Sequence, residues 1–355
     1  MKTAPLSSQQ GLTFVTAESD RRLSGGLATA SAGRSEPARL SMIDPQVVLD
    51  GPEATASEIL DCVVVGGGPA GLTAGLYSRR FHRNVRVVDA GAGRARRITR
   101  SNNVAGFPDG VAGAQLLERM KRHLQQVGGH VVVDTVGNIQ RRVDGLFAVG
   151  LAHELLWARN VILCTGVKDR LPALPGADVV ESADLLRYCP VCDGYEHTGK
   201  RIGVIGNSSH GVREAAFLGN FSRDVWFIEV EGRTADLEMD MRAAGVRQLT
   251  GVARHLAIDH DRHAVVTMDD GEVHRFDVLY AGLGVDPCTQ LATALGAQLD
   301  KIGNIVTDAH GRTSVDNLYA AGDVVSALDQ IGVAVGHAAI AATAVHNGLC
   351  REVAA

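Results

Sequence analysis

Short apolar runs separated by glycine-rich turns dominate the pattern of hydrophobic and polar positions along the chain. One run covers residues 59–65, a helical stretch follows it as far as about residue 80, and a second apolar run covers residues 85–89. Short apolar runs bounded by turn residues are typical of buried strands, and their alternation with helices is typical of a parallel sheet. We therefore predict a strand, a helix and a second strand here.

The same alternation continues toward the C-terminus. Residues 130–164 alternate apolar and polar positions with Gly, Asn and Asp turns, as a small antiparallel meander does. The other predicted elements are helices at about 112–127, 212–220 and 332–346, the last rich in Ala and Gly, and strands at 201–205, 225–229 and 317–320. These elements predict an α/β fold.

Residues 1–57 differ from the rest of the chain. They are rich in Ser, Ala, Gly, Thr and Arg and lack sustained periodicity, so we expect a disordered or loosely attached tail. An organelle-targeting segment is the weaker alternative, because Glu18, Asp20 and Glu36 are unusual in such segments.

A glycine-rich turn follows the first predicted strand and reads Gly66-Gly67-Gly68-Pro69-Ala70-Gly71. The first glycine of a G-x-G-x-x-G turn makes the tight bend, the second lets backbone approach a pyrophosphate, and the third lets helix and strand pack closely. The helix N-terminus then offers free N–H groups to the phosphates. Asp89 ends the next strand 23 residues after Gly66 and is placed to accept from a ribose hydroxyl. We infer a dinucleotide-binding unit.

A second copy of this unit begins at Arg201. Its turn covers residues 206–211, and Glu229 follows Gly206 by 23 residues. Ser208 stands where the middle glycine belongs, and a side chain there would crowd a pyrophosphate. The second copy is therefore either a weakened nucleotide site or a structural relic that binds nothing.

A Cys-x-x-Cys pair, Cys189 and Cys192, lies between the two units. Such a pair can close a disulfide or remain a dithiol, and the two states differ by two electrons. The alternative is half of a zinc site, but structural zinc needs four ligands, and we find no second ligand pair. His197 is the nearest histidine, and the remaining cysteines are isolated ones: Cys62, Cys164, Cys288 and Cys350. A redox role is favoured, with no bound metal.

Composition narrows the function classes. The chain has 355 residues, enough for two domains, with 45% hydrophobic and 21% charged residues. A net charge of −5 and only 4% aromatic residues argue against nucleic acid or an anionic membrane as the main partner. A basic cluster at residues 94–100 is interpreted as a solvated loop or, alternatively, a phosphate or partner contact.

The cysteine pattern and the search for targeting signals indicate the cellular compartment. Six scattered cysteines do not form a secreted disulfide framework, and no apolar run reaches the roughly 18 residues that span a bilayer. No secretory signal follows Lys2. We expect a cytoplasmic protein.

Together these motifs resemble the low-molecular-weight thioredoxin reductase family of flavoproteins over about residues 58–350. The resemblance rests on the glycine turn, Cys164-Thr165-Gly166, Cys189-Pro190-Val191-Cys192-Asp193-Gly194 and Ala320-Ala321-Gly322-Asp323-Val324. It implies two Rossmann-like domains of three-layer ββα type. The first is a discontinuous FAD-binding domain at 58–170 and 280–352, and the second is a pyridine-nucleotide-type domain inserted at 171–279. A homodimer is also implied.

The resemblance assigns cofactor roles to residues of the first domain. The glycine turn, with Gly66, Gly68, Pro69, Ala70 and Gly71, would hold the ADP half of FAD together with Asp89. Asp323 would bind the ribityl or phosphate part, and Gln330 would lie beside the isoalloxazine. The further implied cofactor-binding residues are Thr165, Gly166, Gly322 and Ile331.

The resemblance also assigns the redox roles. Cys192 would face the flavin, Cys189 would exchange with the substrate disulfide, and Asp193 would be the proton donor. A thiolate is the competent nucleophile, which explains an acid beside the pair. The implied partner is a thioredoxin-like protein or a small-molecule disulfide or dithiol.

The chain departs from the family pattern in two places. Glu229 and Glu231 stand where NADPH-using members carry basic residues, and Ser208 crowds the turn, so NADPH is expected to be a poor donor. NADH avoids the phosphate repulsion but still meets Ser208, so it stays an alternative donor that is expected to be weak. The Gly-Gly-Gln stretch that contacts the flavin in the family is replaced at residues 90–94. A ferredoxin-type donor, a dithiol oxidase using oxygen, and a non-catalytic redox sensor remain alternatives, although Asp193 favours the reductase direction.

Overall fold

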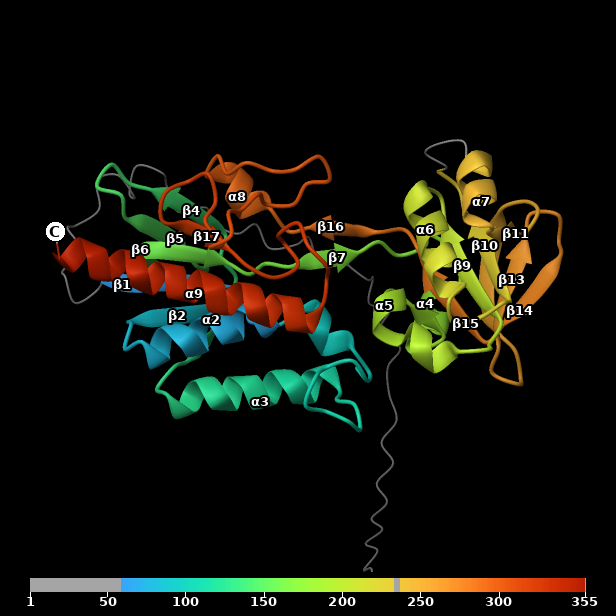
Figure 1. Ribbon diagram of the computed structural model, residues 1–355, viewed down its shortest axis with the longest axis horizontal. Coiled ribbons are helices and arrows are strands. Elements are labelled where there is room, and N and C mark those ends of the chain that lie inside the picture. The colour runs from blue at the N-terminus through green and yellow to red at the C-terminus, as the bar shows by residue number, and fades with distance from the viewer. Residues whose placement is uncertain (1–58, 233–236, 355) are drawn as a thin grey trace, which may run out of the picture. The chain divides into compact units, whose positions relative to one another are not determined.

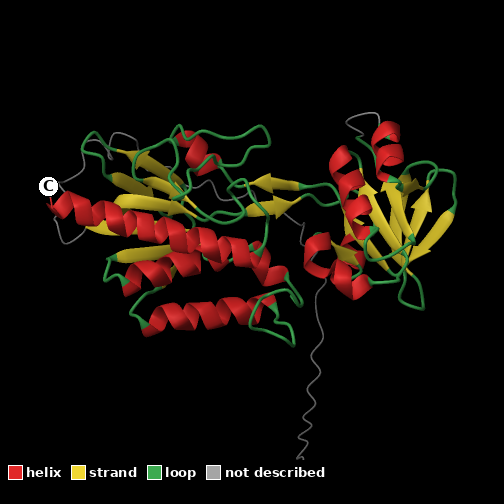
Figure 2. Cartoon of the chain, in the orientation of Figure 1, coloured by secondary structure: helices red, strands yellow, loops and turns green. Residues whose placement is uncertain are grey.

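The computed structural model describes residues 59–232 and 237–354, so the tail expected at residues 1–57 lies outside the described residues. The described residues form two α/β domains, each with a mainly parallel sheet, helices on one face and antiparallel strands on the other (Figures 1 and 2). The predicted pair of Rossmann-like domains is thereby confirmed.

The first domain is built on a seven-stranded sheet in the order β3–β2–β1–β6–β5–β4, with β17 paired to β6. The strands are β1 (Ile59–Val65), β2 (Val85–Asp89), β3 (Val131–Val133), β4 (Asn138–Arg141), β5 (Phe147–Gly150), β6 (Leu155–Leu163) and β17 (Leu318–Ala320). β1, β2, β3 and β17 pair in parallel, whereas β4 and β5 form an antiparallel meander with the start of β6. β6 therefore belongs to both the parallel sheet and the meander.

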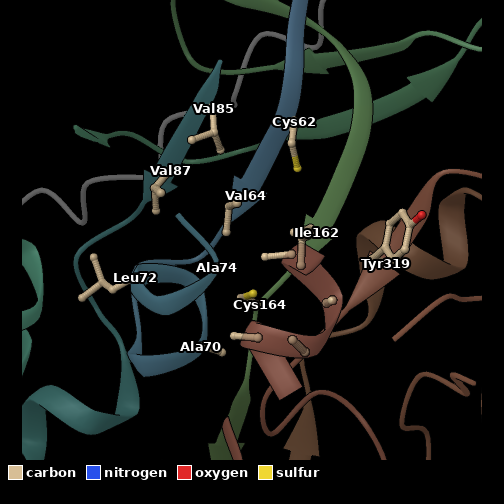
Figure 3. Close-up of a cluster of buried hydrophobic side chains, with 14 of the residues drawn as sticks. Cys62, Val64, Ala70, Leu72, Ala74, Val85, Val87, Ile162, Cys164 and Tyr319 are labelled. Carbon is tan, nitrogen blue, oxygen red and sulfur yellow. The ribbon is translucent and has the colours of Figure 1, made fainter. Parts of the chain in front are cut away.

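Helices α2 (Pro69–Arg80), α3 (Gly113–Gln126) and α9 (Ile331–Ala354) pack on one face of this sheet. Figure 3 shows Val64 and Ile162 of the sheet pointing toward Ala70 and Ala74 of α2. A second buried cluster fills the other face, under the meander and α8 (Gln290–Ala294). Residues from both ends of the described chain thus share one core, because α9 lies along α2.

The second domain repeats this plan. Its parallel sheet has the order β11–β10–β9–β15–β8, and an antiparallel sheet has the order β12–β13–β14. The strands are β8 (Leu186–Arg187), β9 (Ile202–Gly206), β10 (Val225–Glu229), β11 (Arg247–Gln248), β12 (Ala253–Ile258), β13 (Ala264–Met268), β14 (Val273–Phe276) and β15 (Val278–Ala281). The helices are α4 (Ala177–Ser182), α5 (Pro190–Asp193), α6 (Ser209–Leu218) and α7 (Glu238–Ala244).

The junction between the domains differs slightly from the expected boundaries. β7 (Val167–Asp169) and β16 (Val285–Pro287) form a separate two-stranded antiparallel ribbon where the chain passes from one domain to the other (Figure 2). The expected boundary at residue 279 falls inside β15, which belongs to the second sheet through its pairing with β9. The strand continues to Ala281 because this residue still pairs with Ile205 of β9, and all four strand residues are buried.

α9 is longer than the helix predicted at 332–346 and more apolar than the sequence interpretation allowed. Among the described helices, it is long and apolar enough to span a membrane by length and composition, with a mean hydropathy of 1.3 over Ile331–Arg351. A core helix meets the same criterion, and one face of α9, including Ala338, Ala341 and Val345, lies in the first buried cluster. Core packing accounts for the apolar character of this face.

Candidate functional site

The predicted site residues converge on one cavity of about 570 Å³ in the first domain and at its contact with α5. Pockets of this size are typical of small-molecule and cofactor sites. Every predicted cofactor or redox residue except Gly71 lines it: Gly66, Gly68, Pro69, Ala70, Asp89, Thr165, Gly166, Cys189, Cys192, Asp193, Gly322, Asp323, Gln330 and Ile331. The chain therefore places the glycine turn and the cysteine pair on the walls of a single cavity.

The outer glycines of the turn are required by packing. Gly66 has a φ of +108°, and a Cβ on it would lie 2.2 Å from the carbonyl oxygen of Cys164. A Cβ on Gly71 would lie 1.8 Å from the carbonyl oxygen of Gly66, so only glycine lets α2 approach β1 this closely. Gly71 is absent from the cavity wall because it faces the strand.

The middle glycine has the opposite environment. Gly68 is the N-cap of α2, and a Cβ on it would meet no atom within 4 Å. The open space before a helix N-terminus with Pro69 at its first turn is where a pyrophosphate would be held by backbone N–H groups. At the end of β2, the Asp89 carboxylate accepts from the Gly67 N–H at 3.2 Å and lies 3.9 Å from Lys121. These residues fit an adenine dinucleotide.

The motif cysteines are joined by a disulfide, with their Cα atoms 5.3 Å apart. Cys189 is the N-cap of the four-residue helix α5, which begins at Pro190 and contains Cys192, and the Cys192 N–H donates to the Cys189 carbonyl. Gln330, which precedes α9, donates from its amide nitrogen to both sulfurs, at 3.4 Å for Cys189 and 3.3 Å for Cys192. Asn103 orients this amide by donating to its oxygen at 2.8 Å.

Asp193 directly follows Cys192 and is buried. Arg187 Nε donates to one carboxylate oxygen at 2.6 Å, and the Tyr280 hydroxyl donates to the other at 2.7 Å. Burial lowers the pKa of Arg187, but the charges of Asp193 and Asp184 more than offset it, so its pKa is raised. The Asp193 side chain is therefore held in place by two donors.

A cluster of charges in the same cavity was missed by the sequence interpretation. The Arg94 guanidinium lies 2.8 Å from Asp169, 3.3 Å from Asp323 and 3.9 Å from Asp329. The solvated-loop interpretation of the basic cluster is wrong for Arg94, whose side chain is only 22% exposed, because it is drawn in by these carboxylates. It is on the stretch that replaces the family's Gly-Gly-Gln, and no local pattern indicates its partners.

Burial and charge perturb this cluster strongly. Burial lowers the pKa of Arg94, but the three carboxylates more than offset it, so its pKa is raised. Burial, with a smaller contribution from the neighbouring carboxylate Asp323, raises the pKa of Asp329 to about 6, and burial also raises the pKa of Asp323. Arg94 thus holds together acids that would otherwise repel one another.

Residues 60–338 match the family model of the pyridine nucleotide-disulphide oxidoreductases, which covers most of the chain. The chain belongs to this family.

Individual relatives agree with this assignment. The chain is 28% identical to a thioredoxin reductase of Streptomyces coelicolor over 76% of its own length and 87% of the relative's. It is also 28% identical to an alkyl hydroperoxide reductase component of Xanthomonas campestris, over 85% of this chain but only 59% of that protein.

Solved structures show the same likeness. The thioredoxin reductase of Streptococcus pyogenes has a TM-score of 0.73 at 28% identity, over 82% of this chain and 98% of that one. HlmI has a TM-score of 0.77 at 29% identity, over 85% of this chain and 96% of that one.

The resemblance to thioredoxin reductases and the expectation of an oxidoreductase acting on a sulfur group are confirmed. This family binds FAD and typically a nicotinamide cofactor, so FAD as the cofactor is confirmed as well.

The second unit keeps the family's scaffold with a modified turn. Ser208 is the N-cap of α6, in extended conformation. The Glu229 carboxylate accepts from Gln248 at 3.1 Å, and Glu231 pairs with Arg254. Glu229 ends β10 and Glu231 follows it, where the resemblance led us to expect an unfavourable environment for a nucleotide phosphate.

The other cysteines have structural settings. Cys62 and Cys164 are core residues; burial raises the pKa of Cys62, and it raises that of Cys164 to about 12. Cys288 anchors the site's backbone, since its N–H donates to the Gly166 carbonyl and its own carbonyl accepts from Thr165. Cys62 and Cys164 are poor nucleophiles, because a buried thiol resists ionisation.

A group of Asp259, Asp261 and His263, of which Asp261 is exposed and the other two are partly buried, brings ligand atoms within 4.8 Å of one another. It closes the turn between β12 and β13, where Asp259 accepts from the backbone N–H groups of Asp261 and His263. Asp259 also pairs with Arg275 at 3.1 Å. Turn formation and this ion pair account for the cluster.

Proposed function

We propose that this chain is an FAD-dependent disulfide oxidoreductase that passes electron pairs between bound FAD, the Cys189–Cys192 pair and a substrate disulfide. The observation that supports this most is the placement of the disulfide on the wall of the cavity that holds the glycine turn. Bound FAD supplies a two-electron couple, which matches the two electrons of a disulfide.

The residues around the pair suit this chemistry. When the disulfide opens, charge develops on sulfur, and the Gln330 amide already donates to both sulfur atoms. A preoriented donor stabilises developing charge without reorganising, and Asn103 fixes its orientation. Asp193 stands next to Cys192 as a group that can carry a proton.

The order of exchange and the partner are part of the proposal. Cys192 exchanges with the flavin and Cys189 with the substrate. The side chains of Val191 and Tyr195, next to the pair, are 43% and 78% exposed and provide an apolar surface for a disulfide-bearing partner. That partner is a thioredoxin-like protein or a small-molecule disulfide, and the enzyme acts as a cytoplasmic homodimer.

An anaerobic titration tests this function. The purified protein is mixed with a dithiol, and flavin absorbance is followed alongside the count of protein thiols. We expect the dithiol to bleach the flavin of the wild type. Cys192→Ser should lose this bleaching, and Cys189→Ser should lose exchange with the disulfide substrate.

Cys350→Ser is the matched control, because Cys350 is an exposed free cysteine on α9 that does not line the cavity. It should behave as the wild type. If both motif variants kept full exchange activity, the pair would be structural and the proposed function would be wrong.

A further inference from the structure

Two neighbouring strands hold Asp193 from the same side. Arg187 on β8 and Tyr280 on β15 are register partners in a parallel pairing. Register partners of adjacent strands point to the same face of a sheet, so their two donors reach the same carboxylate, at 2.6 Å and 2.7 Å. The sheet itself therefore sets the position of Asp193.

Both donors are fixed in their charge state and in space. Tyr280 is fully buried, and the side chains of Arg187 and Asp193 are 16% and 11% exposed. Burial, together with the Asp193 charge, raises the pKa of Tyr280, so its hydroxyl remains a donor. Hydrogen bonds to a buried charge are among the strongest in proteins. Each carboxylate oxygen still has a lone pair that can accept a proton.

We propose that Tyr280 is a positioning residue of the redox centre, holding Asp193, with Arg187, so that its carboxylate carries a proton from Cys192 to the leaving thiolate of the substrate. The inference rests on the proposed function. Tyr280 belongs to none of the motifs found in the sequence. It is 87 positions from Asp193 along the chain.

The step can be written in full. Once Cys189 is bonded to one substrate sulfur, the Cys192 sulfur attacks the Cys189 sulfur, and the bond from Cys189 to the substrate breaks. Asp193 takes the Cys192 proton and gives it to the departing thiolate, so a Cys189–Cys192 disulfide and a substrate thiol are formed. The electron pair of the broken bond leaves on the substrate sulfur, and no external reductant enters this step.

Two disulfides of different leaving groups test this role. The FAD-loaded protein, reduced anaerobically, is mixed at pH 8 with hydroxyethyl disulfide, whose alkyl thiolate needs a proton to leave, or with dithiobis(nitrobenzoate), whose aryl thiolate is stable as an anion. Tyr280→Phe should lower the limiting single-turnover rate with hydroxyethyl disulfide about tenfold and with the aryl disulfide less than about twofold. The half-saturating concentration should not change.

Two further variants control the test. Tyr319→Phe, at a buried tyrosine of the first domain, should match the wild type with both disulfides. Asp193→Asn should show the same selectivity as Tyr280→Phe, and the double variant should be no slower than Asp193→Asn, because both changes act on one proton transfer.

Equal losses with both disulfides, additive losses in the double variant, or an unchanged Tyr280→Phe would overturn the positioning role while leaving the proposed function intact. A wild type that exchanges with neither disulfide would overturn both.

Discussion

The two dinucleotide units have the same scaffold but differ at one of the three glycine positions of the turn. In the first, the outer glycines are closed in by backbone, and Gly68 faces open space. In the second, a Cβ on Gly206 would meet the Phe227 ring at 2.7 Å, and one on Gly211 would meet the Gly282 carbonyl oxygen at the same distance. The middle position of the second turn is Ser208.

This contrast separates what the fold needs from what the ligand needs. The glycines that let helix and strand pack are present in both units, whereas the glycine that leaves room for a pyrophosphate is present in the first. A unit can therefore keep its strand–helix packing while its nucleotide site changes. The following experiments test that separation.

The largest effect is expected at the packing glycines. Gly71→Val should lower the free energy of unfolding by at least about 3 kcal/mol, because its Cβ would lie 1.8 Å from the Gly66 carbonyl oxygen. Gly211→Val, with a less severe overlap, should cost about 1–3 kcal/mol. Denaturant unfolding of both variants measures the difference. Equal stability of Gly71→Val and the wild type would contradict the packing argument.

The second largest effect is expected on FAD affinity, at Gly68, the glycine that leaves room for the pyrophosphate. Gly68→Val should fold as the wild type does, because a Cβ there meets nothing, but it should weaken FAD binding about a hundredfold by filling the pyrophosphate space. Ser208→Val, the same change in the second turn, should leave FAD affinity unaltered. Fluorescence titration of the flavin-free proteins with FAD gives both values. Unchanged FAD affinity in Gly68→Val would show that the pyrophosphate binds elsewhere.

A smaller effect is expected for the nicotinamide donor. NADPH should reduce the bound flavin slowly, since each like charge near its 2′-phosphate weakens binding by about 1.4 kcal/mol, or tenfold. Ser208→Gly combined with Glu231→Gln should speed the reduction about tenfold or more. Stopped-flow absorbance at micromolar NADPH measures both rates. Rapid reduction of the wild type would restore NADPH as the donor.

The smallest effect concerns the acids of the first cavity. Asp329 in the folded protein holds its proton up to about pH 6, whereas an unfolded aspartate loses it near pH 4. Its contribution to stability is therefore present below about pH 4 and is lost as the pH rises through about 6. As the pH rises from about 4 to about 6, the free energy of unfolding of Asp329→Asn should therefore increase by about 1 kcal/mol relative to that of the wild type. The gain is limited because the Asp329 side chain is partly exposed.

Unfolding of the FAD-free proteins at several pH values measures this difference. Asp270→Asn, at an exposed aspartate of the second domain, is the control and should show no such trend. A pH-independent difference for Asp329→Asn would contradict the raised pKa.

The parts of the fold that follow from local patterns could be predicted from the sequence. Apolar runs, glycine spacing and an acid at fixed distance identify both units, because each signal is contained within about thirty residues. The long helix at the C-terminus was predicted shorter than α9, because Asn347 and Gly348 are residues typical of a helix end, yet α9 continues through them to Ala354. The sheet of β12–β14 was not predicted, because no glycine motif or acid at fixed spacing marks its antiparallel strands.

The polar contacts of the site could not be predicted in this way. Arg94 meets Asp323 across 229 positions, and Gln330 meets Cys192 across 138. Such pairs depend on how the sheets assemble rather than on spacing along the chain. The resemblance placed Gln330 beside the flavin ring, and the structure adds its contact with both sulfurs. Tyr280 offered no signal, because a tyrosine in an apolar strand looks like a core residue.

The shared core of the first domain also determines the order in which the domains can fold during synthesis. β1 and α2 emerge early from the ribosome, but β17 and α9, which complete their sheet and helical layer, are among the last elements made. The inserted domain has its own sheets and can fold first, as independent domains do during translation.

Folding of the inserted domain then brings β7 and β16 together, so residues more than a hundred positions apart are held in register. This closes the long loop before the C-terminal helix arrives and lowers the entropy cost of joining the two halves. Until then Val64 and Leu72 lack their final partners and are surfaces that a chaperone can bind. The cofactor cavity can therefore be completed only after β17 and α9 have been synthesised.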